Sequence, residues 1–406
     1  MRIFARLVAA VLATSCTRPA RPTTIAAQQR PPPAEGTMAP HAEAIAPRLA
    51  LGDCHTCVLQ EHGAVRCVGA TRARAAATPT TREVIARLAR ARSIEGLAPL
   101  RSIAAAGAHT CGITATGAVQ CWDMLETGAA STPTTIAGVE DATQLAVGAT
   151  FRCALTSRRD RPVLCWGSND HGQLGRATRT QTAESAAPPL GLGDVTTIAA
   201  GIAHACATRR DGAVLCWGNN DHGQLGLRDA AIVTTPTRIE GLPSARGVAA
   251  GSNQSCAISA DYSARCWGEE YVGDPHHQLS RPRDRPSEFV DLQGRVFARS
   301  VATARFATCV LTPEYSTACA SSDASRSLPD YTAIEPEART DARDVVQVGL
   351  SDAHGCRLRR DGRVECVGAN DCGQLGSPSY AEMHSARFVR LELSDTRADP
   401  TTPPAR

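Results

Sequence analysis

Cysteine is the residue whose type and spacing could do chemistry most directly in this chain of 406 residues. The chain has 17 cysteines, and fourteen of them fall into seven pairs, six with a spacing of ten residues and one with a spacing of twelve. Thiols at such spacings could form disulfides, bind zinc or take part in redox exchange. The pairs are Cys57 with Cys67, Cys111 with Cys121, Cys153 with Cys165, Cys206 with Cys216, Cys256 with Cys266, Cys309 with Cys319 and Cys356 with Cys366.

The residues between the paired cysteines predict a β-hairpin. In residues 206–216, two short strands flank a three-residue turn that ends in Gly212, which suits a positive φ. This register places Cys206 opposite Cys216, within reach of a disulfide. The pair with a spacing of twelve has a turn longer by two residues, at 158–162, and so keeps the register. We therefore predict seven disulfide-bonded hairpins.

Zinc binding and redox chemistry are the alternatives for these cysteines. Structural zinc sites usually combine two closely spaced Cys or His pairs, and only Cys54-x-x-Cys57 has such spacing here. Cys57 already has a partner in Cys67. The spacing thus favours disulfides over a metal or a redox motif.

The hairpins recur along the chain with a period near fifty residues. Their first cysteines are separated by 54, 42, 53, 50, 53 and 47 residues. A strand of small residues precedes each hairpin, as at 198–201, and a Pro-x-x-hydrophobic stretch follows it, as at 236–239. Four short strands per unit, with small residues on crowded inner strands, predict an all-β fold. We expect a seven-bladed β-propeller with four-stranded antiparallel blades over residues 48–393.

Three motifs within the units resemble a known family. They are A-A-G-x-x-H-x-C at 199–206, D-G-x-V-x-C-W-G at 211–218 and the tail G-x-N-x-x-G-Q-L-G, which is complete at 167–175, 218–226 and 368–376. Together they resemble the regulator of chromosome condensation repeat, a family of seven-bladed propellers. The tail is degraded in blades one, two, five and six, where the prediction rests on the cysteine pairs and the period.

Three cysteines remain outside the hairpins: Cys16, Cys54 and Cys372. Cys54 lies at the entry of the first blade, and Cys372 replaces the histidine of the tail in the last blade. Because ring closure makes these blades neighbours, we predict a Cys54–Cys372 disulfide that fastens the first blade to the last.

The N-terminal residues predict export. A basic start and a short apolar run precede Cys16, in the layout of a secretory signal that is too short to span a bilayer. Small residues before Cys16 resemble a bacterial lipobox, which implies a lipidated N-terminus in the cell envelope, periplasmic or at the surface; ordinary cleavage nearby and secretion is the alternative. Residues 17–47 and 394–406 are Pro- and Thr-rich, and we expect a disordered tether and a disordered tail. An oxidising compartment would also let the disulfides persist.

Composition limits the partners. The formal net charge is +3, charged residues make up 20% of the chain, and every basic residue is arginine. This balance is too close to neutral for a dedicated nucleic-acid binder. We expect a monomer that meets the membrane only through a lipid anchor, and export makes the family's nuclear exchange-factor role implausible.

Histidines and tryptophans also recur at fixed repeat positions. A histidine stands two residues before the first cysteine in four blades, and Phe151, Gln254 and Ala307 occupy that position in three others. Four imidazoles could hold a metal, but a histidine within the repeat motif favours a role in packing or hydrogen bonding. The tryptophans follow the second cysteine, and we expect them to pack inside the blades. These residues are His55, His109, His204, His354, Trp122, Trp166, Trp217 and Trp267.

Arginine pairs at three hairpin turns are candidate binding residues. They could bind an anionic surface, although aspartates alternate with them and favour simple solvation of the turns. Insertions at 71–95, with a short helix expected over 82–92, and at 320–343 are further candidates for specificity. The arginines are Arg158, Arg159, Arg209, Arg210, Arg359 and Arg360.

These features predict a binding scaffold for a protein or cell-envelope ligand. The alternative is a cell-envelope enzyme, a polysaccharide hydrolase or lyase with a site built from loops. The chain has no G-x-S-x-G elbow and no metalloprotease motif, and the tail glycines lack the strand–loop–helix context of a phosphate loop. We therefore predict no catalytic residues, no metal and no cofactor.

Overall fold

The computed structural model describes residues 48–71, 82–160, 162–179, 182–227, 230–268, 290–291, 298–305, 307–321, 344–377 and 384–393. The chain divides into two compact units, Met1–Ala44 and Ile45–Arg406. The predicted signal segment with Cys16, the tether at 17–47, the tail at 394–406 and most of the insertion at 320–343 lie outside the described residues. No helix within these ranges is long and apolar enough to cross a membrane.

The second unit consists of consecutive antiparallel sheets, each built from strands in chain order. The first strands are β1 (Leu49–Leu51), β5 (Leu100–Ala106), β9 (Ala142–Val147), β13 (Val195–Ala200), β17 (Ala245–Ala250), β21 (Ser300–Thr303) and β24 (Val345–Leu350). The second strands are β2 (His55–Leu59), β6 (His109–Thr114), β10 (Phe151–Thr156), β14 (His204–Arg209), β18 (Gln254–Ser259), β22 (Ala307–Leu311) and β25 (His354–Arg359). The third strands are β3 (Val65–Gly69), β7 (Val119–Asp123), β11 (Val163–Ser168), β15 (Val214–Asn219), β19 (Ala264–Gly268), β23 (Thr317–Ser321) and β26 (Val364–Ala369). The fourth strands are β4 (Arg92–Ser93), β8 (Thr134–Thr135), β12 (Thr182–Ala187), β16 (Ile232–Arg238), β20 (Val290–Asp291) and β27 (His384–Arg390).

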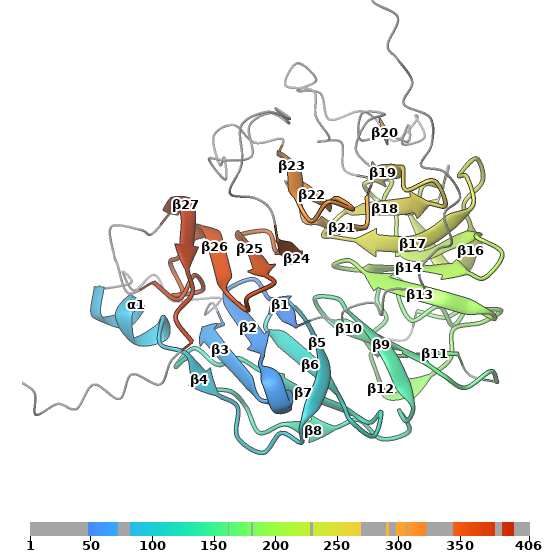
Figure 1. Cartoon of the computed structure of the whole chain (residues 1–406). Coiled ribbons are helices and arrows are strands. Elements are labelled where there is room, and N and C mark those ends of the chain that lie inside the picture. The colour runs from blue at the N-terminus through green and yellow to red at the C-terminus, as the bar shows by residue number, and fades with distance from the viewer. Residues whose placement is uncertain are drawn as a thin grey trace, which may run out of the picture. The chain divides into compact units, whose positions relative to one another are not determined.

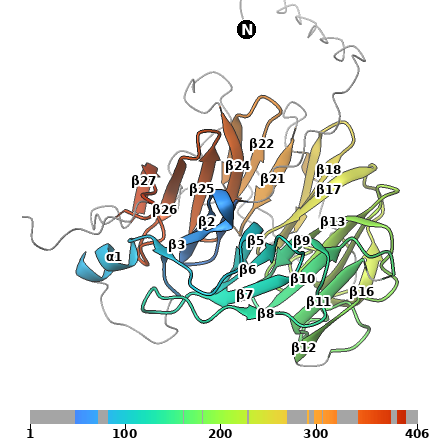
Figure 2. The same ribbon diagram turned by 60° about the horizontal axis from the view of Figure 1, so that its bottom comes forward.

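The sheets are arranged as the blades of a propeller (Figures 1 and 2). Each first strand contacts the first strand of the next sheet, from β1 through β5, β9, β13, β17 and β21 to β24, and β24 contacts β1. The first strands are therefore the inner strands, which is why they are rich in small residues that allow close approach. In Figure 1 the blue β1 and β2 accordingly lie beside the red β24 and β25.

The all-β propeller with four-stranded antiparallel blades is confirmed, with one difference in number. Six sheets have four strands, and the sheet of β21, β22 and β23 has three within the described residues. The expectation of seven four-stranded blades thus holds for six.

The seven hairpins between second and third strands have the predicted register. Cys206 lies opposite Cys216 in β14 and β15, and Cys153 lies opposite Cys165 despite the longer turn. The Cα atoms of the Cys206–Cys216 pair are 4.1 Å apart. Gly212 has a φ of 81°, as the turn requires.

All seven predicted cysteine pairs are joined as disulfides. Hairpins in blades with a degraded tail motif follow the rule as well: Cys121 bonds to Cys111 in the second blade, and Cys266 bonds to Cys256 in the fifth. The disulfides are Cys57–Cys67, Cys111–Cys121, Cys153–Cys165, Cys206–Cys216, Cys256–Cys266, Cys309–Cys319 and Cys356–Cys366.

The hydrophobic core lies between neighbouring blades. One cluster joins Phe151 and Leu155 of the third blade to Ile198, Ala205 and Trp217 of the fourth. Each sheet thus buries its apolar residues against the next sheet, as expected when a single repeat cannot form a core alone.

The insertion in the first blade forms the short helix that the sequence predicts, over a smaller range. Helix α1 spans Arg82–Leu88 and buries Ile85 and Leu88. Its C-terminal end approaches the last blade so closely that a Cβ on Gly373 would lie 2.6 Å from the nitrogen of Ala89. The helix therefore packs where the first and last blades meet.

Candidate functional site

The loops of the propeller fall on two faces. Because the strands of a blade are consecutive and antiparallel, the hairpin turns and the connections to the next blade lie at one end, which we call the turn face. The backbone of the structure agrees, since the Arg210 N–H donates to the Asp194 carbonyl and the Arg360 N–H donates to the Asp344 carbonyl. The other end, the tail face, carries the loops after the inner strands and the tail motifs.

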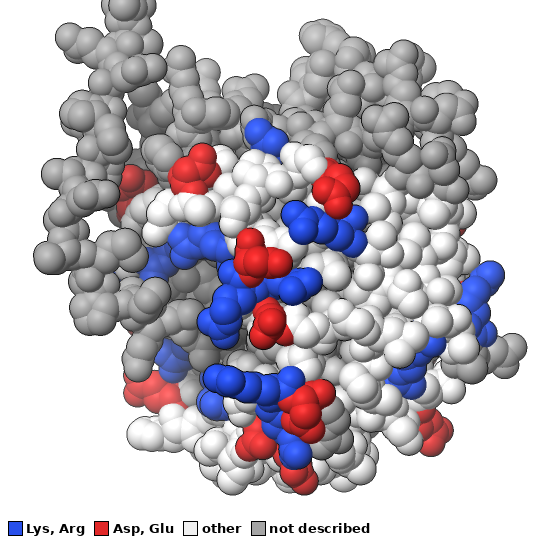
Figure 3. Space-filling view, turned by 90° about the vertical axis from the view of Figure 1, so that its right-hand side faces the viewer, with Lys and Arg blue, Asp and Glu red and all other residues white. Residues whose placement is uncertain are grey.

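The candidate arginines lie on the turn face beside carboxylates. Arg158 Nε is 3.7 Å from Asp160 Oδ1, and Arg209 Nη2 is 3.6 Å from Asp211 Oδ2. The view in Figure 3 shows the same interleaving of basic and acidic side chains, without a field of one sign. Such mixed charges do not form a general anion-binding surface.

In the last blade one of the two candidate arginines, Arg359, is half-buried. Arg359 Nε donates to Glu365 Oε2 at 3.0 Å, and Arg357 Nε donates to the same oxygen at 2.6 Å. These hydrogen bonds help to lower the pKa of Glu365, although burial acts against them. Arg359 therefore belongs to an internal ion pair, whereas Arg360 is exposed.

Two tyrosines on the turn face, the exposed Tyr262 and the half-buried Tyr315, were missed in the sequence. Tyr262 and Tyr315 stand six residues after the first cysteine, the position that Gly212 occupies in the fourth blade. Both have positive φ, 67° and 61°. When the repeats are aligned on their cysteines, these two blades have tyrosine where other hairpins have glycine. This change was the sequence signal that could have identified the two tyrosines.

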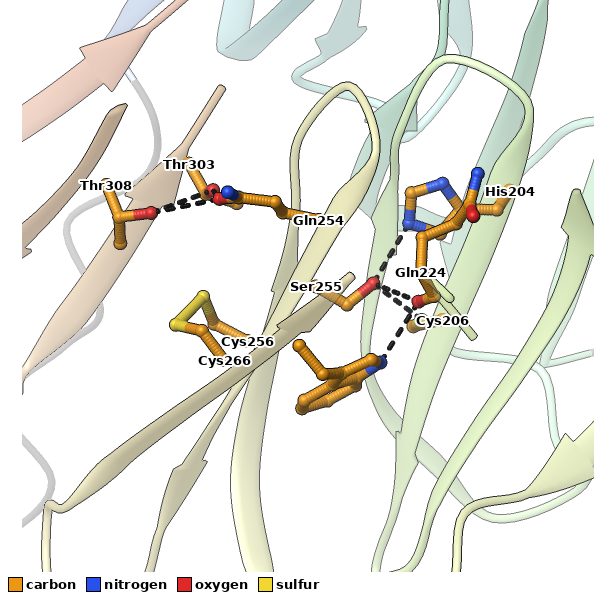
Figure 4. Close-up of a disulfide and its surroundings, with 10 residues drawn as sticks. His204, Cys206, Gln224, Gln254, Ser255, Cys256, Cys266, Thr303 and Thr308 are labelled. Atoms are coloured by element: carbon orange, nitrogen blue, oxygen red, sulfur yellow. Dashed lines mark hydrogen bonds between the residues drawn. A yellow bond between two sulfur atoms is a disulfide. The ribbon is translucent and has the colours of Figure 1, made fainter. Parts of the chain in front are cut away.

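The repeat histidines connect neighbouring blades. His55 Nε2 is 2.8 Å from Thr110 Oγ1, His204 Nε2 is 2.9 Å from Ser255 Oγ, and His354 Nε2 is 2.7 Å from Thr56 Oγ1. Each hydroxyl belongs to the residue just before the first cysteine of the next blade. Figure 4 shows His204 and Ser255 in this arrangement.

The exceptions at this position follow the same geometry. In the fifth blade, Thr308 donates to Gln254 Oε1 at 3.2 Å, so Gln replaces His opposite a hydroxyl (Figure 4). Phe151 shares a buried cluster with Ala205, so an apolar ring meets a methyl group. The residue types at each blade interface are thus matched, and the imidazoles serve packing rather than a shared metal.

Burial keeps these imidazoles neutral. His55, His204 and His354 are fully buried. Burial lowers the pKa of His55 and of His204 to about 4 and that of His354 to about 3. A neutral imidazole suits a site where one hydroxyl is the facing partner.

His109 departs from this pattern because the next blade offers Arg152 instead of a hydroxyl. His109 Nδ1 lies 2.5 Å from Asp123 Oδ1 of the neighbouring strand β7, and both side chains are partly exposed. The hydrogen bond with His109 lowers the pKa of Asp123, and the charge of Arg152 acts in the same direction. This cluster is an accessible pair of a potential base and an orienting carboxylate.

The tail motif also connects blades, on the tail face. Asn220 Oδ1 accepts the Leu225 N–H at 2.9 Å, and Leu225 is fully buried. The carbonyl of Gln224 accepts hydrogen bonds from Trp267 Nε1 at 3.0 Å and from Ser255 Oγ at 2.9 Å, both from the next blade (Figure 4). The predicted packing role of the tryptophans is confirmed, since all four are buried.

The first and last blades meet without a shared sheet, because β1–β4 and β24–β27 are each continuous in sequence. A disulfide joins Cys54 to Cys372, with Cα atoms 5.5 Å apart. Thr56 Oγ1 donates to the Gln374 carbonyl at 2.9 Å, and Gln347 Nε2 donates to the Leu49 carbonyl at 2.9 Å. The ring is thus closed by a covalent bond and side-chain hydrogen bonds.

The side chains of Cys54, Asp371 and Cys372 lie close enough to one another to hold a metal ion together. The disulfide engages both sulfur atoms, so no thiolate is available for a metal here. The four repeat histidines are not among the potential metal-binding groups of the described ranges.

The middle of the chain contains RCC1 repeats. Its residues 162–208 and 211–258 match the regulator of chromosome condensation (RCC1) repeat, and a second description of that repeat matches residues 195–224.

Two curated proteins are similar over parts of the chain. The mitochondrial RCC1 domain-containing protein RUG3 of Arabidopsis thaliana is 30% identical over 160 residues, 35% of this chain and 36% of that protein. The regulator of chromosome condensation of Drosophila melanogaster is 35% identical over 95 residues, 23% of this chain and 17% of that protein. The matched segments therefore span about a third or less of these relatives.

The crystal structure of human WBSCR16 has a similar fold. Its TM-score is 0.61 at 20% identity, over 80% of this chain and 90% of that chain. This similarity supports the propeller fold alone.

Proposed function

We propose that this protein is an exported propeller that binds another protein through its loop faces. The proposal rests on one observation about the propeller's side chains. The repeat histidines and tail motifs make contacts between blades, whereas Tyr262 and Arg360 are exposed on the turn face. Tyrosine and arginine are enriched at protein interfaces.

Disulfide bonding supports export. Eight disulfides join sixteen of the 17 cysteines, and such bonds persist in oxidising compartments. We propose that Cys16 carries a lipid that anchors the chain in a bacterial cell envelope. Metabolic labelling with a fatty acid should mark the wild-type protein and not the Cys16→Ser variant; equal labelling would rule out this attachment site.

We also propose that the sheet of β21, β22 and β23 is the seventh blade of a monomeric ring. Its inner strand contacts both β17 and β24, and its hairpin carries the Cys309–Cys319 disulfide, as the hairpins of the other blades carry theirs. Light scattering of the purified protein should give the mass of a single chain; a dimer mass would contradict this part of the proposal.

Co-purification tests the binding function. The oxidised full chain should retain a specific protein from envelope extract, identified by mass spectrometry, and the two should associate again as purified components. A chain that recovers no partner able to rebind in purified form would contradict the proposal.

A cell-envelope enzyme is the second candidate, favoured by the partly exposed His109–Asp123 pair beside Arg152. Such a pair could abstract a proton, and an arginine could neutralise a uronate carboxylate during polysaccharide cleavage. An assay panel of glycans should then show turnover that is lost in His109→Gln. No turnover with any glycan would favour the binding function.

A further inference from the structure

The turn tyrosines occupy a backbone conformation that the repeat otherwise gives to glycine. The residue six positions after the first cysteine has a positive φ in six hairpins. It is glycine in four of them, Gly63, Gly117, Gly212 and Gly362, and tyrosine in the adjacent fifth and sixth blades. A bulky side chain is rarely found in this left-handed region, and such exceptions cluster at functional sites.

The surrounding hydrogen bonds hold both tyrosines in this conformation. The Tyr262 N–H donates to the Ser259 carbonyl at 2.9 Å, and the Tyr262 carbonyl accepts from Ala298 N–H of the next blade at 2.7 Å. The N–H of Tyr315 donates in the same way to the Thr312 carbonyl at 3.0 Å. The turn therefore keeps its shape whichever residue stands there, and tyrosine is not required for folding.

Arginines stack on both rings. The guanidinium of Arg246 lies 4.2 Å from the ring centre of Tyr262, and that of Arg299 lies 4.8 Å from the ring centre of Tyr315. Both arginines stand ten residues before the first cysteine of their blade, so the same Arg–Tyr pair is built twice. Arg360 of the last blade also lies 4.8 Å from the Tyr315 ring centre.

The orientation of these side chains suits a ligand. A guanidinium stacked on an aromatic ring can still donate its N–H groups to a carboxylate. Arg299 Nη1 donates to the Tyr315 hydroxyl at 2.7 Å, so the exposed Arg246 and Arg360 are the arginines that can make the two-point contact. Tyr262 is 37% exposed, and Arg246 and Arg360 are exposed, whereas Tyr315 and Arg299 are half-buried. Each tyrosine therefore has one exposed arginine stacked on it.

We propose that Tyr262, Tyr315, Arg246, Arg299 and Arg360, here called the Arg–Tyr patch, bind an acidic segment of a partner protein. This proposal rests on the proposed binding function and assigns it a site. Discrete carboxylates fit better than a uniform polyanion, because acidic side chains lie among the arginines. Asp344 Oδ1, for example, is 3.9 Å from Arg360 Nε.

Substitution of both tyrosines by glycine tests the proposal. Tyr262→Gly/Tyr315→Gly restores the residue of the other turns, so the variant should fold and unfold at the same temperature as the wild type or higher. Peptides selected from a displayed random library on the full oxidised chain should be rich in Asp and Glu. The double variant should bind them about tenfold more weakly or worse, as for the loss of interface hot spots.

A matched control is Arg238→Ala, which removes an exposed arginine of β16 in the fourth blade and should leave peptide affinity within about twofold. Unchanged affinity of the folded double variant would overturn the Arg–Tyr patch, and so would selected peptides without acidic residues. Heparin binding that is as tight as peptide binding and is lost in the double variant would also overturn it. A double variant that still retains the co-purified protein would also overturn the patch but leave the binding function intact. Failure of the wild type to retain any protein would instead count against the binding function itself.

Discussion

Three imidazoles without access to solvent connect neighbouring blades, each through one hydroxyl. Gly201 shows how the repeat accommodates them: a Cβ there would lie 2.2 Å from His204 Cε1, so the glycine of A-A-G-x-x-H leaves space for the ring. In the last blade Ser351 takes this place, and its Oγ lies 2.9 Å from His354 Nδ1. At the residue scale the motif is therefore a packing unit in which ring, hydroxyl and glycine depend on one another.

Acid should destabilise the propeller through these histidines. Burial lowers the pKa of His204 to about 4, from an ordinary value of 6.5, so the unfolded chain binds the proton more tightly. The free energy of unfolding should be constant above about pH 6.5 and fall as the pH decreases to about 4, by about 3 kcal/mol for this group. Urea unfolding between pH 7.5 and 4 measures this slope.

His204→Gln provides the comparison, because Gln254 occupies the same position in the fifth blade. The variant should lose less stability than the wild type over this pH range. Parallel pH profiles for the two proteins would contradict the assignment.

Thr56 should be important for ring closure, since it contacts both His354 Nε2 and the Gln374 carbonyl. Thr56→Val leaves two buried polar groups without this hydroxyl and should cost about 2 to 4 kcal/mol. Thr56→Ser keeps the hydroxyl, as Ser255 does in the equivalent position, and should cost less than about 1.5 kcal/mol. Urea unfolding at pH 7.5 compares the three proteins, and equal losses in both variants would show that the hydroxyl is not the cause.

At the scale of the element, each hairpin is fixed twice, by its turn and by its disulfide. The turn at Gly212 closes with a hydrogen bond from its N–H to the Arg209 carbonyl at 2.9 Å, and its carbonyl accepts from Ala245 of the next blade at 2.9 Å. A hairpin is therefore also a contact between blades, which explains why its tip has the same backbone shape whether it carries glycine or tyrosine.

Loss of one hairpin disulfide should have a moderate effect. Cys206→Ala/Cys216→Ala opens a loop of ten residues and should lower the free energy of unfolding by roughly 2 to 3 kcal/mol, because the unfolded chain gains entropy. Chemical unfolding without reductant measures the difference. A loss above about 5 kcal/mol would indicate that packing around the sulfurs, more than chain entropy, supports the blade.

At the scale of the whole molecule, the ring has a seam between the first and last blades. Among the described residues no strand crosses this seam, which is held by Cys54–Cys372, by the contacts of Thr56 and Gln347, and by the packing of α1 near Gly373. A disulfide that closes a loop of this length restricts the unfolded chain more than a hairpin disulfide does.

Removal of the seam disulfide should therefore cost more than removal of a hairpin disulfide. Cys54→Ser/Cys372→Ser should lower the free energy of unfolding by up to about 5 kcal/mol, and hydrogen exchange should increase first in β2 and β25. The hairpin variant of the fourth blade is the control. Unchanged exchange in the first and last blades would show that the noncovalent contacts close the ring without the disulfide.

The sequence alone determined the hairpins, because cysteine spacing and turn residues are local and fix the register of two adjacent strands. It also indicated the short helix and the burial of the tryptophans, since both follow from patterns within one unit. The tertiary structure decided which side chains of neighbouring blades meet: His204 faces Ser255, whereas His109 turns to Asp123 because Arg152 occupies the equivalent position in the next blade. The stacking of Arg246 on Tyr262 was likewise decided only by the tertiary structure. Arg246 lies in the inner strand β17 and Tyr262 in the hairpin turn, and these two segments come together only when the sheet forms.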